Sequence, residues 1–173
     1  MKVKPRYIAI ITFSVIGLIL IIGGLWGDVL GVLKASGYIP YTIVEVQEMA
    51  FTRCIQCHPI DKVTKYCMRC GPPFVVVVHN VKKLIALEKG RPGREYLKGM
   101  TDAEAVAITQ VWNALVGNWE ETWREKDIIK LLEGDDAQIN LLKTPVKERK
   151  IEVALRGKRA PGTYEEVYGV MKP

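Results

Sequence analysis

An uncharged stretch near the N-terminus is the feature that most restricts how this chain can fold. Residues 7–27 read YIAIITFSVIGLILIIGGLWG and contain no Asp, Glu, Lys, Arg or His. A helix rises 1.5 Å per residue, so a helix of this length spans roughly 30 Å of hydrocarbon. We therefore expect residues 1–33 to form a membrane anchor helix, with the lipid bilayer as one partner of the chain.

The charges beside this stretch predict its orientation. Lys2, Lys4 and Arg6 precede it, whereas only Asp28 and Lys34 follow it closely. Because positive charge stays on the cytoplasmic side, we expect a single-pass protein with a cytoplasmic N-terminus and an extracytoplasmic, periplasmic remainder. A cleaved signal peptide is the alternative, but its apolar part would span only about 7–15 residues.

The motif Cys54-Ile55-Gln56-Cys57-His58 predicts covalent haem. In a C-x-x-C-H sequence each thiol adds across one vinyl group of the haem, and the adjacent imidazole binds the iron. We therefore expect one haem c, held by Cys54 and Cys57 with His58 as an iron ligand.

A second cysteine pair leaves another interpretation open. Cys67 and Cys70 extend the pattern to C-x2-C-x9-C-x2-C. Four thiolates in two pairs suit tetrahedral zinc, so a structural zinc-ribbon accessory subunit of a membrane complex is the main alternative. If haem occupies the first pair, Cys67 and Cys70 are expected to form a short-loop disulfide, or Cys67 acts as an iron ligand or redox switch.

Two segments around these cysteines resemble a known family. The sequence VEVQEMAFTRCIQCH is similar to the N-terminal helix of small one-haem c-type cytochromes, and TDAEAVAITQVW is similar to their C-terminal helix. The resemblance covers roughly residues 41–116. It implies a cytochrome c-like helical domain, placed at 34–126, that acts as a non-catalytic electron carrier in a membrane-bound energy-converting complex. Other subunits of that complex and a redox protein are the implied partners.

The second iron ligand has few candidates. His79 is the only other histidine, and it lies in a helix expected to begin after Pro72-Pro73 and to end at Gly90. The resemblance places a distal ligand at a similar distance after the motif, so we expect His79 to ligate the iron. Met100 is the alternative distal ligand, followed by Met68 or an open site as in a haem sensor.

The helical pattern does not favour His79 strongly. One apolar stripe of this helix comprises Phe74, Val77, Val78, Val81, Leu84 and Ile85. His79 falls on another side, with Val75 and Ala86. Either haem covers this second face, or His79 has no part in ligation.

Local signals predict the next helix clearly. Thr101 and Glu104 form a T-x-x-E capping box. An apolar stripe follows at helical spacing: Ile108, Val111, Trp112 and Leu115.

The last part of the chain turns to charge, glycine and proline. We expect residues 127–173 to form an extended basic tail laid along another subunit. The net charge of +6 is spread along the chain without a phosphate loop, so nucleic acid is not an expected partner. The predicted fold class is mainly α: an N-terminal transmembrane helix, a small cytochrome c-like domain and an extended C-terminal tail.

Overall fold

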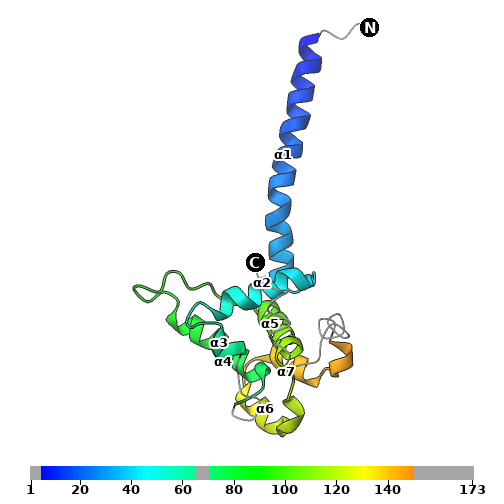
Figure 1. Ribbon diagram of the computed structural model, residues 1–173. Helices are drawn as coiled ribbons and strands as arrows, with labels where there is room; N and C mark the ends of the chain where they lie inside the picture. The colour runs from blue at the N-terminus through cyan, green and yellow to red at the C-terminus, as the bar shows by residue number, and fades with distance from the viewer. Residues whose placement is uncertain (1–4, 65–70, 150–173) are drawn as a thin grey trace. The chain divides into compact units, whose positions relative to one another are not determined.

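The computed structural model describes residues 5–64 and 71–149. The chain divides into two compact units, residues 1–40 and residues 41–173. The described residues form seven α-helices and two short 3-10 helices and contain no strand (Figure 1). The mainly α class agrees with this, whereas two finer parts of the predicted fold do not.

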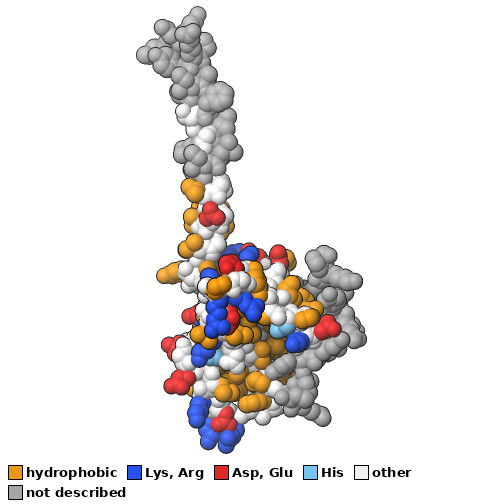
Figure 2. All heavy atoms as spheres, turned by 90° about the vertical axis from the view of Figure 1, so that its left-hand side faces the viewer, with side chains coloured by type: hydrophobic (Ala, Val, Ile, Leu, Met, Phe, Trp, Pro, Cys, Tyr) orange, Lys and Arg blue, Asp and Glu red, His pale blue; other side chains and the backbone are white. Residues whose placement is uncertain are grey.

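The first unit contains the helix α1, Pro5–Ala35. Its side chains are described mostly from Gly23 onward, a part that has four glycines together with Asp28 and Lys34. Glycines add little apolar surface, and the two charges interrupt the rest; Figure 2 shows one acidic side chain among apolar ones there. Within the described residues, no helix is long and apolar enough to cross a membrane. The transmembrane helix in the predicted fold is therefore wrong.

Helix α2, Ile43–Cys54, opens the second unit. Thr42 caps its N-terminus, because the Thr42 hydroxyl accepts from the Glu45 N–H and the Glu45 carboxylate accepts from the Thr42 N–H. One side of the helix is buried through Val46, Ala50 and Cys54, at successive intervals of four residues. The first cysteine of the motif is thus part of the apolar face of α2.

Helix α4, Phe74–Glu88, has the boundaries that the sequence predicts. Pro73 stands at its N-cap, and Gly90 follows its end with a φ of 98°, a conformation that favours glycine. The short helix α3, Asp61–Thr64, lies between α2 and α4 in the sequence.

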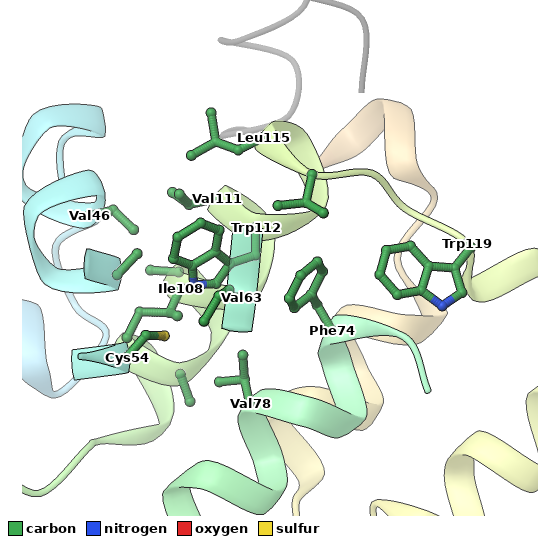
Figure 3. Packing of buried hydrophobic residues seen from close by; sticks show 14 residues of the cluster. Val46, Cys54, Val63, Phe74, Val78, Ile108, Val111, Trp112, Leu115 and Trp119 are labelled. Carbon is green, nitrogen blue, oxygen red and sulfur yellow. The ribbon is translucent and has the colours of Figure 1, made fainter. Parts of the chain in front are cut away.

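Helix α5, Asp102–Leu115, is the centre of the second unit. The predicted capping box of Thr101 and Glu104 is confirmed. The helix packs against α2, α4 and α7 (Figure 1). Figure 3 shows Trp112 of α5 in the main core, beside Phe74 of α4 and facing Cys54 of α2.

Two further helices contradict the predicted extended tail. Helix α6, Glu125–Leu131, and helix α7, Asp136–Lys143, follow a 3-10 turn at Glu120–Thr122. A second apolar cluster joins them to α4; it comprises Val75, Val76, Ile128 and Leu132, with Ile139 and Leu142 beside it. A tail was expected because this segment is rich in charge, but enough apolar residues alternate with the charges to bury one face of each helix.

The described chain ends with a second 3-10 turn, Val146–Glu148, followed by Arg149. The Arg149 guanidinium is buried and lies 2.8 Å from the Glu120 carboxylate. This ion pair fixes residues 146–149 to the domain, because a buried charge is stable only when it is paired. Residues 150–173 of the predicted tail lie outside the described residues.

Adjacent leucines test whether α6 belongs to the core. Leu132 is fully buried and Leu131 is 47 % exposed. We expect Leu132→Ala to lower the free energy of unfolding by about 2–5 kcal/mol, and Leu131→Ala by less than about 0.5 kcal/mol. Urea unfolding followed by circular dichroism measures both. Equal effects of the two substitutions would contradict the packing of α6 against α4.

Candidate functional site

The C-x-x-C-H motif runs from the core to the surface. Cys54 is the last residue of α2, and a turn carries the chain through Ile55 and Gln56 to Cys57. Cys54 is buried, Cys57 is exposed, and neither forms a disulfide with a described residue. The motif therefore presents one thiol inside the domain and one at its surface.

His58 is held by its own neighbour. Its Nδ1 atom lies 3.0 Å from the Pro59 carbonyl oxygen. A carbonyl oxygen can only accept, so Nδ1 carries a hydrogen, and in the neutral ring Nε2 is the nitrogen with the free lone pair. An imidazole whose Nδ1 is held by a carbonyl in this way is prepared to bind a metal through Nε2.

A small apolar pocket brings the motif together with Met100. Its walls contain one thiol, one imidazole and one thioether among aliphatic and aromatic side chains. The lining residues are Cys54, His58, Val63, Phe74, Val77, Val78, Val81, Met100, Ile108 and Trp112. They come from α2, the turn after it, α3, α4, α5 and the residue before the Thr101 cap, so the pocket is formed only in the folded domain.

Trp112 contributes a polar atom to this apolar pocket. The ring is fully buried, and its N–H is directed to the Cys54 thiol, whose pKa it lowers slightly. Figure 3 shows the indole nitrogen on the edge of the ring nearer Cys54.

The environment of Cys54 keeps its thiol protonated. Burial raises the pKa of Cys54 to about 11, and the Trp112 side chain offsets only part of this rise. Desolvation disfavours the charged thiolate relative to the neutral thiol. At neutral pH Cys54 is thus a neutral thiol.

His79 lies elsewhere, on a face of α4 that α7 covers. Its ring is 2 % exposed, and Nδ1 donates to the Asp135 carboxylate at 2.9 Å. Asp135 also accepts from Lys82 Nζ at 3.0 Å and from the Gln138 N–H at 3.2 Å. The structure therefore brings His79 to Asp135, and it does not bring His79 into the pocket that His58 lines.

The chemistry of this donor set fits haem c. One thiol, one imidazole and one thioether share an apolar pocket, whereas the second thiol of the motif, Cys57, is exposed at the surface. The cavity itself measures only about 30 Å³, room for about one or two water molecules. A porphyrin would fit only after the walls had separated.

The described residues give no support for the zinc interpretation. They contain no group of three or more His, Cys, Asp or Glu side chains that could hold a metal ion. Cys67, Met68 and Cys70 lie outside the described residues.

Comparison with known proteins adds nothing to this geometry. No protein-family model matches the chain, and no curated protein or solved structure matches it either.

Sequence reasoning missed two polar groups of the site. The spacing predicts Trp112 as a core residue, but it does not show that the indole N–H lies beside the Cys54 thiol. Gln56 is one of the variable residues of the motif, yet its side-chain oxygen accepts from the Lys98 N–H at 2.7 Å. Only a contact between segments 42 residues apart reveals that role.

The two motif thiols should react at different rates in the chain without haem. We expect iodoacetamide at pH 8 to modify Cys57 at least about tenfold faster than Cys54, because Cys54 is buried and the thiolate is the reactive form. Mass spectrometry of the separated peptides measures both rates. In 8 M urea the rates should converge, and a faster Cys54 in the folded chain would contradict the pocket.

The Asp135 cluster should make stability depend on pH. Burial alone would raise the pKa of Asp135, but hydrogen bonds from His79, Lys82 and the Gln138 N–H outweigh it and lower the pKa. A lowered folded-state pKa contributes stability above the unfolded pKa of about 3.9, and this stability is lost as the pH falls through the folded pKa.

Asp135→Asn isolates the charge, because asparagine also caps helices well. We expect this variant to be less stable than the wild type by about 2 kcal/mol at pH 7. The difference in stability between the two proteins should narrow as the pH falls below about 4. Urea midpoints at pH 7, 5 and 3 measure it, with the exposed neighbour Asp136→Asn as a matched control. A gap that stays constant down to pH 3 would show that the carboxylate charge plays no part.

Proposed function

We propose that the second unit is a haem c domain that carries single electrons. In this proposal Cys54 and Cys57 hold the haem, and His58 and Met100 ligate its iron. The pocket lined jointly by Cys54, His58 and Met100 is the observation that carries the proposal.

Attachment needs no further reagent than the haem. Each thiol adds its S–H across one vinyl group, so a carbon–sulfur bond forms and the thiol hydrogen ends on the neighbouring vinyl carbon. Cys57 at the surface and Cys54 in the wall would hold one porphyrin edge from two depths.

Met100 suits the pocket better than His79, the ligand expected from the sequence. Met100 lines the cavity and packs against the main core. His79 does not line this cavity, because it lies on another face of α4 beside Asp135. A histidine and methionine pair also favours the ferrous state more than two histidines would.

The bound haem supplies the redox centre, because its iron alternates between the ferric and ferrous states. The chain's own residues fix the ligands and keep water from the iron through the valines of α4, Phe74 and Ile108. Closed coordination suits an electron carrier better than a catalyst. The extracytoplasmic location, the parent complex and the redox partner stay predictions of the sequence.

Haem staining tests the proposal directly. The full chain, produced in cells that attach haem to exported proteins, should give a peroxidase-stained band at its own mass of 19.5 kDa after denaturing electrophoresis. Replacing both cysteines, Cys54→Ser and Cys57→Ser, should abolish the stain. A colourless wild-type band with stoichiometric zinc would reject haem and favour the zinc interpretation.

The ferric spectrum then identifies the distal ligand. A sulfur–iron charge-transfer band in the far red, lost on reduction, is expected for the wild type and for His79→Ala. Met100→Ala should lose the band. If His79→Ala loses low-spin character and Met100→Ala keeps it, Met100 is not the ligand.

A further inference from the structure

The segment that carries Met100 is tied down at three points. The Lys98 N–H donates to Gln56 Oε1 at 2.7 Å. On the other side of Met100, Asp102 accepts from Lys82 Nζ at 2.5 Å. The third tie joins Glu104 and Arg53, whose atoms Oε1 and Nη2 lie 3.0 Å apart.

These ties reach both walls of the pocket. Arg53 and Gln56 flank Cys54 in the sequence, whereas Lys82 stands on α4, one residue after the pocket residue Val81. The Met100 segment is therefore fixed to the segment with the thiols and His58, and separately to the valine wall.

We propose that Gln56, Arg53 and Lys82 are positioning residues that hold Met100 over the haem iron and keep the sixth coordination site closed. The inference rests on the proposed function, because it assigns these residues a role toward Met100 as a ligand. It separates an electron carrier from a haem sensor: a thioether is a neutral, weak ligand, and it resists competitors only when the surrounding chain holds it in place.

Gln56 is the most direct of the three ties. Its Nε2 atom donates to the Arg53 carbonyl at 3.2 Å, which leaves Oε1 directed to Lys98. The Gln56 side chain therefore joins the backbone segment that carries His58 to the segment that carries Met100. A residue inside the C-x-x-C-H motif thus controls the far side of the iron.

Lys82 is also held by Asp135, which in turn pairs with His79. Its ammonium group lies between Asp102, 69 % exposed, and Asp135, 3 % exposed. Asp135 in turn is held by His79 and by the N-terminus of α7. His79 would thus influence the iron site indirectly, through Asp135, Lys82 and Asp102, without contacting it.

Competition by imidazole for the ferric iron of the holoprotein measures how firmly Met100 is held. In Gln56→Leu, which removes the acceptor at similar size, the apparent dissociation constant for imidazole should fall about two- to tenfold, the effect of one hydrogen bond. Gln56→Glu keeps an acceptor for the Lys98 N–H but loses the donor to the Arg53 carbonyl, so it should restore only part of the wild-type value. Carbon monoxide binding to the ferrous form should follow the same order.

The Lys82 tie has its own matched pair. Lys82→Met should lower the dissociation constant for imidazole about two- to fivefold, as expected for one partly exposed ion pair. Lys83→Met, at the exposed neighbouring position of α4, should leave the constant unchanged. This arm keeps the inference testable if Gln56→Leu does not fold.

The outcomes separate the two proposals. A chain that takes up no haem rejects the proposed function. A holoprotein with the far-red band, in which Gln56→Leu and Lys82→Met bind imidazole as the wild type does, rejects only the positioning role.

Discussion

The packing of α5 against three helices at once is the constraint on which the rest of the second unit depends. Trp112 is fully buried at its centre, with its ring centroid 5.3 Å from that of Phe51 and 6.2 Å from that of Phe74. Phe51 stands one turn before Cys54 on α2, and Met100 stands just before the cap of α5. The crossing of α2 and α5 therefore sets how far the thiol lies from the thioether, and the core positions the site.

Helix α4 serves two apolar regions because it is buried on two faces. The face with Phe74 and Val78 belongs to the main core, whereas Val75 and Val76 meet α6 and α7. His79 lies on this second side, where a polar ring costs free energy unless it is paired. Asp135 pairs with it and also begins α7, so one carboxylate both stabilises the buried ring and fixes where α7 starts.

Features with a local cause were predictable from the sequence. Proline before α4, glycine after it and the Thr101 capping box act within a few residues, and all three are confirmed. The failures concern contacts between distant segments. Residues 127–143 were predicted to be part of a charged tail, because the role of their few apolar side chains is visible only when they pack against Val75 and Val76 of α4. Likewise, the sequence shows that His79 lies off the apolar stripe, but Asp135, 56 residues away, decides what covers it.

Burial of Cys54 favours folding of the domain but opposes the proposed attachment of haem. In the haem-free domain Cys54 is a core residue, with a pKa raised to about 11 and a cavity of only about 30 Å³ beside it. A thiol adds to a vinyl group only when the two meet, so the contact of Cys54 with Val78 and Trp112 has to open first. Cys57 and His58 need no such opening, because they already lie at the surface or the rim. The apolar packing that closes the pocket therefore competes with haem until attachment is complete, and the same side chains then form the walls around it.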